Sequence, residues 1–326
     1  MPTILVTGGA GYVGSHCCKY LHRAGWLPVV VDNLDTGHRD FVRWGPFEQG
    51  DIRDRDFVLG VIDRHKPVAA MHFAAKSLVS ESVQAPDLYY DNNVGGALTL
   101  LECLRDRGVR CLVFSSTCAI YGVQDKPIPE GATKNPLSPY GFSKLVCEQM
   151  MDDFDHAYGL KSVRLRYFNA AGADPEAEIG EHHSPETHLL PITLDVALGL
   201  RERLQVYGSD YPTPDGTAIR DYIHVLDLAA AHLKAIEHLI GGGASVALNL
   251  GTGAGHSVLE VVGAAETVTG RAIRTQAAPR RPGDPAALVA EPSQARRLLG
   301  WSADHSGLPE IIADAWRWHQ ERFAGK

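Results

Sequence analysis

Cysteine is scarce in this chain, and its spacing excludes two common kinds of site. The six cysteines lie at positions 17, 18, 103, 111, 118 and 147, and none of them belongs to a C-x-x-C pair. Neither a structural zinc motif nor a dithiol redox motif is therefore indicated. Several of these residues fall in apolar runs, where a free cysteine behaves as a small hydrophobe, so we expect reduced, buried thiols.

Long apolar runs and an N-terminal leader are also lacking. No stretch approaches the roughly 18 uninterrupted apolar residues of a membrane span. The chain runs from Met1 almost directly into a glycine loop, without a basic segment and a long apolar one. We expect a cytoplasmic protein with no membrane partner.

Positive charge is in deficit. The 326 residues carry 31 Lys and Arg against 39 Asp and Glu, which gives a formal net charge of −8. Because nucleic-acid binders usually present a basic face, we expect no nucleic-acid partner. Hydrophobic residues make up 44 % and charged residues 21 %, which is ordinary for a globular protein with a sizeable core.

Short β-branched runs alternate with longer helical patterns through the first half of the chain. We expect strands at 4–7, 28–32, 68–73, 111–115 and 162–168, and helices at 12–24, 54–65, 88–107 and 139–158. This alternation predicts a parallel sheet covered on both faces. Beyond residue 169 the pattern loosens, with a turn at 213–216 and further helices expected at 189–201, 225–239, 257–269 and 308–323.

A glycine-rich loop follows the first expected strand and opens the first helix. Gly8, Gly9, Gly11 and Gly14, with Tyr12 and Val13, fit the pattern G-x-x-G-x-x-G. Glycines allow a tight turn there and let backbone N–H groups approach a pyrophosphate at the helix N-terminus. A glycine turn without a ligand remains the alternative for this motif taken alone.

An acidic residue ends the second expected strand. Asp32 stands eighteen residues after Gly14, where an acid accepts hydrogen bonds from the adenosine ribose and repels a 2′-phosphate. It therefore favours NAD over NADP, against the alternative of a solvated acid. Asn33, Asp51 and Ile52 are expected on the adenosine side. Together these features predict an α/β fold: a Rossmann-type doubly wound parallel sheet with a smaller, discontinuous C-terminal α/β substrate lobe.

Tyr140 and Lys144 form a Tyr-x-x-x-Lys pair on the expected helix 139–158. Positions four apart share a helix face. A lysine ammonium beside a phenol stabilises the phenolate, so we expect Lys144 to lower the pKa of Tyr140 from its usual value of about 10 and make it a general base. The alternative is an exposed helix face.

A hydroxyl group at the end of a parallel strand would complete the site, because ligands bind there in such sheets. Thr117 follows Ser115 and Ser116, and we expect it to hydrogen-bond the reacting oxygen. The alternative is a hydroxyl that only caps the next turn.

These residues together resemble the extended short-chain dehydrogenase/reductase superfamily, and within it the UDP-glucose 4-epimerase family, also called UDP-galactose 4-epimerase. The resemblance covers essentially the whole chain. It is carried by segments 6–16, 72–75, 81–83, 89–94, 166–169, 211–217, 220–225, 249–251 and 280–284.

The resemblance implies an isomerase of galactose metabolism that works through a hidden redox cycle. Tyr140 would take the proton from the sugar 4-hydroxyl while hydride passes to tightly bound NAD. A transient 4-keto sugar would turn over in the site, and hydride would return to its other face. Residues 1–170 would form the NAD-binding domain, and residues 171–326 would mainly bind the UDP-sugar, with about 219–250 returning to the first domain.

The resemblance also assigns residues to each ligand. Beyond the glycine loop and the acidic residues above, Phe73, Ala74, Ala75, Asn92, Ser115, Tyr140, Lys144, Tyr167 and Phe168 would contact the cofactor. The substrate site would comprise Thr117, Asn169, His188, Leu189, Tyr207, Arg220, Arg281, Asp284 and Leu288. Arginine has an independent rationale, since a guanidinium fork matches phosphate oxygens, although Arg220 could equally form an exposed salt bridge.

Two positions depart from the family pattern. Some relatives carry a phosphate-contacting lysine where this chain has Ser77, with Lys76 adjacent. Leu288 aligns with a position where tyrosine excludes N-acetylated sugars and small residues admit them, so UDP-GlcNAc and UDP-GalNAc remain open.

Other activities are less consistent with the sequence. Cys118 and Ala119 stand where 4,6-dehydratases carry an acidic pair. Epimerases of UDP-pentoses or UDP-uronates, and a non-catalytic NAD-binding regulator, remain alternatives. His182, His183 and His188 suggest a metal, but loop histidines are more often simply polar, and we expect no metal because this chemistry needs none.

The expected helix 139–158 carries a broad apolar face that includes Phe142, Leu145 and Val146. Such a face is usually ordinary core. The resemblance implies that this helix and helix 88–107 build a two-fold interface, so we expect a homodimer.

Overall fold

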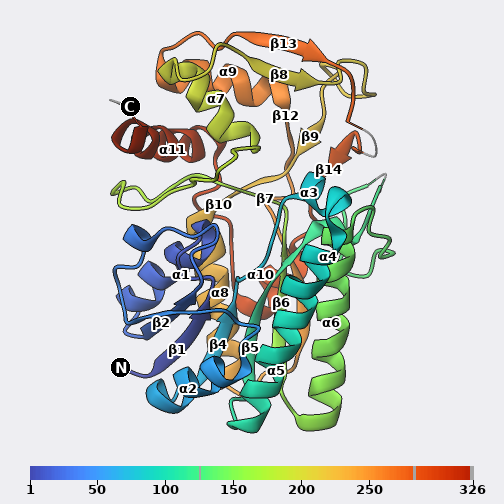
Figure 1. Ribbon diagram of the computed structural model, residues 1–326. Coiled ribbons are helices and arrows are strands. Elements are labelled where there is room, and N and C mark those ends of the chain that lie inside the picture. Colours follow the sequence, from blue (N-terminus) through green and yellow to red (C-terminus); the bar gives the residue numbers. More distant parts are fainter. Residues whose placement is uncertain (125, 282–283, 324–326) are drawn as a thin grey trace.

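A computed structural model of the chain describes residues 1–124, 126–281 and 284–323 (Figure 1). Two members of the 280–284 segment, Pro282 and Gly283, and the last three residues of the expected second region, 324–326, lie outside the described residues.

The first half builds strands and helices in alternation, as the sequence predicts. The strands are β1 (Thr3–Thr7), β2 (Leu27–Asp32), β3 (Phe47–Gln49), β4 (Ala69–His72), β5 (Cys111–Thr117) and β6 (Lys161–Tyr167). The helices are α1 (Tyr12–Arg23), α2 (Arg55–His65), α3 (Val79–Gln84), α4 (Pro86–Tyr89), α5 (Gly96–Asp106) and α6 (Pro139–Tyr158), with short 3-10 turns η1 (Arg39–Phe41) and η3 (Cys118–Ile120).

Seven parallel strands form the central sheet, in the order β11-β6-β5-β4-β1-β2-β3. The strand order reverses beside β1, so the carboxyl ends of β1 and β4 flank the crevice where such sheets bind ligands. The predicted Rossmann-type α/β class is therefore confirmed. β3 was not predicted, because three residues are too few to show a periodicity.

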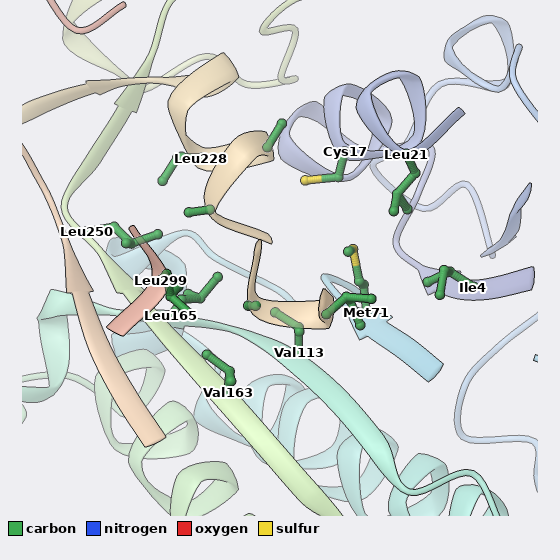
Figure 2. Packing of buried hydrophobic residues seen from close by; sticks show 14 of the residues in the cluster. Ile4, Cys17, Leu21, Met71, Val113, Val163, Leu165, Leu228, Leu250 and Leu299 are labelled. Carbon is green, nitrogen blue, oxygen red and sulfur yellow. The ribbon is translucent and has the colours of Figure 1, made fainter. Parts of the chain in front are cut away.

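Helices cover both faces of this sheet. Cys17 and Leu21 of α1, with Leu228 of α8 (Val225–Ile240), pack on Met71 and Val113 in one face (Figure 2). Residues of α2, α5 and α6 pack on the other face, which includes Leu5, Val29 and Leu112. Alternate strand residues point to opposite cores, which explains why the strands are apolar throughout.

The second half contributes to both the sheet and a smaller region. β11 (Val246–Leu250) pairs with β6 at the sheet edge, and α10 (Ser293–Leu299) packs nearby through Leu299. The remaining elements are β7 (Asn169–Ala171), α7 (Leu189–Leu198), β8 (Leu204–Tyr207), β9 (Ile219–Arg220), β10 (Tyr222–His224), β12 (His256–Ser257), α9 (Val258–Thr269), β13 (Thr275–Ala278), β14 (Ala287–Leu288) and α11 (Leu308–Phe323).

This smaller region has a core of its own. Leu194 of α7, Val206 of β8, Val261 of α9 and Ile311 of α11 belong to one buried cluster. Three short sheets, β10-β7, β12-β9-β14 and β13-β8, join these helices. In Figure 1 the region lies above the carboxyl ends of the central strands.

The helix expected at 88–107 is modified in the structure. Helical conformation runs from Pro86 to Asp106, but Tyr90–Gly95 form a π-helical segment, η2. A π segment adds a residue to the turn and rotates the side chains that follow, and such segments are frequent at functional sites.

All six cysteines are free, as predicted; four are buried, and Cys111 and Cys118 are partly exposed. Among the described residues, no helix has both the length and the hydropathy needed to cross a membrane.

Candidate active site

The glycine loop between β1 and α1 brings the backbone close to the start of the helix. Gly8 has a φ of +75°, and a Cβ there would lie 2.4 Å from the nitrogen of Ala74. A Cβ on Gly14 would lie 2.2 Å from the carbonyl oxygen of Gly8, so only glycine fits. Gly11 caps α1 without a side chain, and the first turn holds no acidic residue. The positive end of the helix dipole can therefore meet a phosphate.

Asp32 is held beside this loop. Its carboxylate accepts hydrogen bonds from the backbone N–H of Ala10 at 3.0 Å and of Leu34 at 2.9 Å. Burial raises the pKa of Asp32, and these two donors oppose the rise. The fixed carboxylate retains lone pairs that can accept hydrogen bonds from ribose hydroxyls.

The other expected adenosine-side residues adjoin Asp32. The Asn33 amide donates to Asp51 at 3.4 Å. Asp51 also pairs with Arg53 at 2.7 Å, and this guanidinium lowers the pKa of Asp51 to about 2. Ile52 is buried, and it would collide with a Cβ on Gly96. The structure therefore brings Asn33 and Asp51 together, but the Asp51 carboxylate is also paired with Arg53.

The segment after β4 follows the same edge of the sheet. The backbone N–H groups of Phe73 and Ala74 both donate to the Thr7 carbonyl, at 2.8 and 3.1 Å, and Ala75 follows. Lys76, next to Ser77, extends its ammonium to Asp35 at 2.7 Å.

Asn93 joins this segment to the helix that carries Tyr140. Its side chain accepts from the backbone N–H of Lys76 at 2.9 Å and donates to the Ser143 hydroxyl at 3.0 Å. Asn92, the residue selected from the sequence, donates to Asn93 at 3.0 Å. Sequence reasoning missed Asn93 because the π-helical register of η2 cannot be read from the spacing of residues.

Tyr140 and Lys144 lie in the first two turns of α6, beside the end of β5. Ser138 caps the helix by accepting the Gly141 N–H at 3.2 Å. The Thr117 hydroxyl lies close enough to the Tyr140 phenol to oppose the rise in its pKa, and it accepts the Ala119 N–H at 3.1 Å. The Lys144 ammonium donates to the Ser115 carbonyl at 2.8 Å.

The structure corrects the expected charge state of this pair. We expected the Lys144 ammonium to lower the pKa of Tyr140, but burial raises the pKa of Tyr140 to about 12, and the Thr117 side chain opposes this only in part. Burial also lowers the pKa of Lys144 to about 8. Helix spacing places the two residues on one face of α6 but does not reveal the depth at which they lie.

The remaining expected cofactor residues lie at the ends of β5 and β6. The Ser115 hydroxyl is hydrogen-bonded to the Tyr167 hydroxyl. Phe168 is 7 % exposed and donates its backbone N–H to Leu250 of β11 at 3.2 Å. The structure therefore brings Ser115, Tyr167 and Lys144 together around one strand end.

A buried ion pair that sequence reasoning missed fixes α6 against these strands. Glu148, one turn after Lys144, pairs with Arg166 of β6 and accepts the Ser116 hydroxyl at 2.6 Å. Both side chains are 3 % exposed. Arg166 also donates to the Tyr121 hydroxyl at 2.7 Å. The available signal was an arginine within an expected buried strand, which requires a buried partner.

The two arginines expected to bind the substrate each have a partner in the structure. Arg220 pairs with Asp284. Its guanidinium also opposes the rise that burial causes in the pKa of Cys118, the residue after Thr117. The Arg281 guanidinium lies 4.1 Å from the centre of the Tyr207 ring. The structure thus groups Arg220 with Asp284 and Arg281 with Tyr207, as two cationic groups able to meet phosphate oxygens.

Asn169, Leu189 and Leu288 lie on separate short elements. Asn169 of β7 donates its backbone N–H to Asp221 at 3.0 Å. Leu189 begins α7 and packs on the core of the smaller region. Leu288 pairs in register with Arg220 and packs against the cluster that contains Phe168.

His188 belongs to a cluster that the sequence did not predict. Its Nδ1 lies 2.8 Å from Glu181 and 3.2 Å from Glu186, and the His183 Nδ1 lies 3.5 and 3.4 Å from the same two carboxylates. Burial opposes protonation, but the carboxylates raise the pKa of His188 to about 10 and that of His183 to about 9.

The residues at the β1–α1 loop fit a dinucleotide. A Cβ on Gly14 would collide with the Gly8 backbone, so the loop turns tightly onto the helix start; this start carries no competing acid, and Asp32 is fixed one strand away. These are the features that pyrophosphate and ribose groups require.

Comparison with known proteins agrees with this geometry. Residues 4–251 match the model of the NAD dependent epimerase/dehydratase family. A UDP-glucose 4-epimerase from Rhizobium leguminosarum bv. trifolii is 54 % identical over 318 residues, 97 % of each chain.

Solved structures give the same result. That of UDP-glucose 4-epimerase from Brucella ovis in complex with NAD matches with a TM-score of 0.95, 50 % identity and coverage of 97 % of this chain and 98 % of the other. That of the Stenotrophomonas maltophila enzyme with bound NAD and formylated UDP-arabinopyranose matches with a TM-score of 0.97, 42 % identity and full coverage of both chains (100 % each). The chain belongs to the NAD dependent epimerase/dehydratase family.

Proposed function

We propose that this chain is an NAD-dependent UDP-glucose 4-epimerase, which interconverts UDP-glucose and UDP-galactose. The observation that carries the proposal is the arrangement at the end of β5, where the Tyr140 phenol meets Thr117 and Lys144 is anchored on Ser115. The full-length identity to UDP-glucose 4-epimerases supports it.

NAD, when bound, supplies the group that accepts hydride from the sugar C4 and returns it. The glycine loop would hold its pyrophosphate and Asp32 its adenosine ribose. Ser115, Lys144 and Tyr167, which are joined to one another at the ends of β5 and β6, would contact the remainder.

Tyr140 would move the proton at the sugar 4-hydroxyl. Tyr140 can accept that proton only as the phenolate, and its raised pKa makes the phenolate scarce near neutral pH, so the reaction needs a contact that stabilises the phenolate. The Thr117 side chain adjoins the phenol, where it opposes the rise in the pKa of Tyr140, and it would orient the reacting oxygen. Lys144 lies one turn along the same helix, and a proton on its ammonium would favour the phenolate.

The two parts of the chain would divide the ligands. Residues 1–170 would form the NAD-binding domain, and 171–326 would mainly bind the UDP-sugar through Arg220, Arg281 and their neighbours. The segment of about 219–250 would return to the first domain; in support, α8 packs on α1 and β11 pairs with β6.

The direct test is turnover without added cofactor. Purified protein is incubated with UDP-galactose alone, and UDP-glucose is measured by chromatography. We expect conversion to an equilibrium mixture. Absence of conversion by protein that demonstrably contains NAD would refute the epimerase proposal and favour a non-catalytic NAD-binding protein.

The sugar range is tested at Leu288. Its side chain packs against the cluster that contains Phe168 and its strand partner is Arg220, which supports a position between the proposed cofactor and substrate regions. We expect UDP-galactose to be preferred over UDP-GalNAc, and Leu288→Ala to narrow that preference. Equal turnover of both sugars by the unaltered protein would contradict Leu288 as the gate.

We also propose a homodimer built on α4, η2, α5 and α6. Leu88, Tyr90, Leu98 and Phe142 are each 39–47 % exposed, which is unusual for large apolar side chains on neighbouring elements. Sedimentation should give twice the 35.3 kDa chain mass, and Leu98→Glu should shift the protein toward monomer. A wild-type monomer at micromolar concentration would contradict the proposal.

A further inference from the structure

The loop between β7 and α7 directs four potential ligand side chains at one point. Glu181, His183, Glu186 and His188 each offer one ligand atom, and these atoms all lie within 4.8 Å of one another. The two carboxylates are well buried, with side chains 7 % and 11 % exposed. Both imidazoles present the same atom, Nδ1, to these carboxylates.

The separations resemble those of a tetrahedral metal site. Zinc–ligand bonds of about 2.0–2.2 Å place neighbouring N and O ligand atoms about 3.3–3.6 Å apart. The His183 Nδ1 lies 3.5 Å from Glu181 and 3.4 Å from Glu186. The His188 Nδ1 lies 3.2 Å from the other oxygen of Glu186, Oε1, and 2.8 Å from the Glu181 Oε1. The separation of 2.8 Å is below the range for a zinc site and would have to open to admit an ion.

A second observation also suggests a missing ligand. The His183 Nδ1 is inaccessible to solvent and makes no hydrogen bond, although it faces two carboxylates. Its ion-pair contacts with these carboxylates are long, at 3.5 and 3.4 Å, and a buried nitrogen that makes no hydrogen bond is costly. A cation between the four groups would satisfy it. By contrast, the cluster of Asp174, Glu176 and Glu178 already surrounds the Lys19 ammonium, at 2.5–2.9 Å.

We propose that Glu181, His183, Glu186 and His188 bind one divalent transition-metal ion of the zinc type. Two imidazoles with two carboxylates suit zinc and its neighbours, whereas magnesium and calcium prefer oxygen ligands alone. A cavity of about 320 Å³, lined by Glu181, His183 and Glu186 among others, provides a route for the ion.

The surroundings hold these ligands in place. The Glu186 Oε1 accepts the backbone N–H groups of Thr187 at 2.8 Å and of His188 at 2.9 Å. The Glu181 carbonyl accepts the Trp318 indole N–H of α11 at 3.2 Å. Such outer contacts orient ligands in metal sites. The ion would fasten the loop to α11 and to the start of α7, with His183 against the Tyr12 ring of α1.

His188 is also one of the residues that the resemblance assigns to the UDP-sugar site, so the metal must be tested apart from the proposed epimerase activity. Metal binding is therefore measured without any sugar nucleotide. Success or failure of the epimerase assay does not bear on it.

The first experiment uses the unaltered protein. After chelator treatment, the chain is titrated with Co²⁺ and then with Zn²⁺. We expect the visible bands of tetrahedral cobalt, one ion per chain, and displacement by one equivalent of zinc. X-ray absorption of the zinc form should show nitrogen and oxygen ligands at about 2.0–2.2 Å. No stoichiometric binding, or an octahedral all-oxygen spectrum, would overturn the proposal.

Variants then locate the site. His183→Gln and Glu181→Gln should each weaken zinc binding by at least about 100-fold. His156→Gln, which removes an exposed histidine from α6, is the matched control and should bind zinc like the unaltered chain. Zinc should also raise the melting temperature of the unaltered protein and of the control, but not of the two ligand variants. Undiminished binding by folded His183→Gln and Glu181→Gln proteins would refute the assignment.

Discussion

The catalytic pair and the Glu181–His188 cluster both bury ionisable groups, but they favour opposite charge states. At the pair, burial lowers the pKa of Lys144 to about 8 and raises that of Tyr140 to about 12. In the cluster, burial also opposes charge, but the two carboxylates outweigh it and raise the pKa of His183 to about 9 and of His188 to about 10.

The difference comes from the nearest partner. The Lys144 ammonium donates to a neutral carbonyl, that of Ser115. The carboxylate one turn away on its helix, Glu148, is already paired with Arg166 and Ser116. In the cluster, each histidine faces two carboxylates, and neither carboxylate is paired with an arginine or lysine among the residues that the structure describes. Depth alone therefore does not set the charge of a buried group; the pairing of its neighbours does.

The largest expected effect is at the phenol. Tyr140→Phe removes the proton-transfer group and should lower kcat for UDP-galactose about 10³-fold, within the range typical of general acid–base residues. NAD content and melting temperature should remain near those of the unaltered protein.

Tyr89→Phe is the control for this change. The Tyr89 ring lies 6.4 Å from that of Tyr140, but its hydroxyl is bound by Leu78 and Glu81. Its kcat should fall less than about tenfold, the size of one ordinary hydrogen bond. If Tyr140→Phe retained most of its turnover, Tyr140 would not be the base.

The next effect concerns Lys144 and pH. Its pKa lies below the usual 10.5, so between pH 8 and 10.5 the unfolded chain binds more protons than the folded chain, and stability rises with pH. Below pH 8 the buried lysine is charged and lowers the free energy of unfolding by its full cost. The shift in pKa from 10.5 to about 8 corresponds to about 3 kcal/mol, because one pKa unit is worth about 1.4 kcal/mol.

Lys144→Met should therefore gain in free energy of unfolding relative to the unaltered chain at pH 7, and this gain should shrink by about 3 kcal/mol by pH 10.5. Urea unfolding at several pH values measures it. Loss of the hydrogen bond to the Ser115 carbonyl lowers the free energy of unfolding of Lys144→Met equally at pH 7 and pH 10.5, so it does not affect the change with pH. If the difference in free energy of unfolding between the two proteins did not change with pH, burial would not lower the pKa of Lys144.

A smaller effect is expected in the cluster, with the opposite sign. The raised pKa values of His183 and His188 mean that their pairing stabilises the fold fully below about pH 6.5, and this stabilisation is lost as pH rises through 9 and 10. Glu181→Gln should cost about 2 kcal/mol at pH 6 and much less at pH 10.5. His188 is 47 % exposed, so solvent screening keeps the loss below that of a fully buried pair.

Glu202→Gln is the matched control, because Glu202 pairs with Arg203 at the surface and is 69 % exposed. We expect Glu202→Gln to lower the free energy of unfolding by less than about 0.5 kcal/mol at either pH. The unfolding measurements use chelator-treated protein, so that no ion replaces the protons. A Glu181→Gln loss that grew with pH would contradict the assigned pairing.

Long, periodic elements were predictable from the sequence. The expected helix 139–158 is α6, and the expected helix 308–323 is α11. The short strands β3, β8, β9 and β13 were not predicted, because two to four residues carry too little periodicity and depend on tertiary pairing. The seven-residue helix α10 was missed for the same reason.

The candidate site was predictable in its parts and less so in its charges. Spacing brought out Tyr140, Lys144 and Thr117; in the structure Thr117 adjoins the Tyr140 phenol, and the Lys144 ammonium is bound to the Ser115 carbonyl. It did not reveal Glu148 with Arg166, or the fact that His183 and His188 share two carboxylates. Those contacts join segments whose relative positions depend on the folded chain, as does the burial that sets the pKa of Tyr140.

The most direct test of the difference between the two regions is one NMR titration of the chelator-treated protein, with isotope labels on the lysine Nζ and histidine ring positions. The structure predicts an inversion of the usual order: His188 keeps its proton to about pH 10, whereas Lys144 loses its proton near pH 8. A Lys144 pKa above that of His188 would contradict the account.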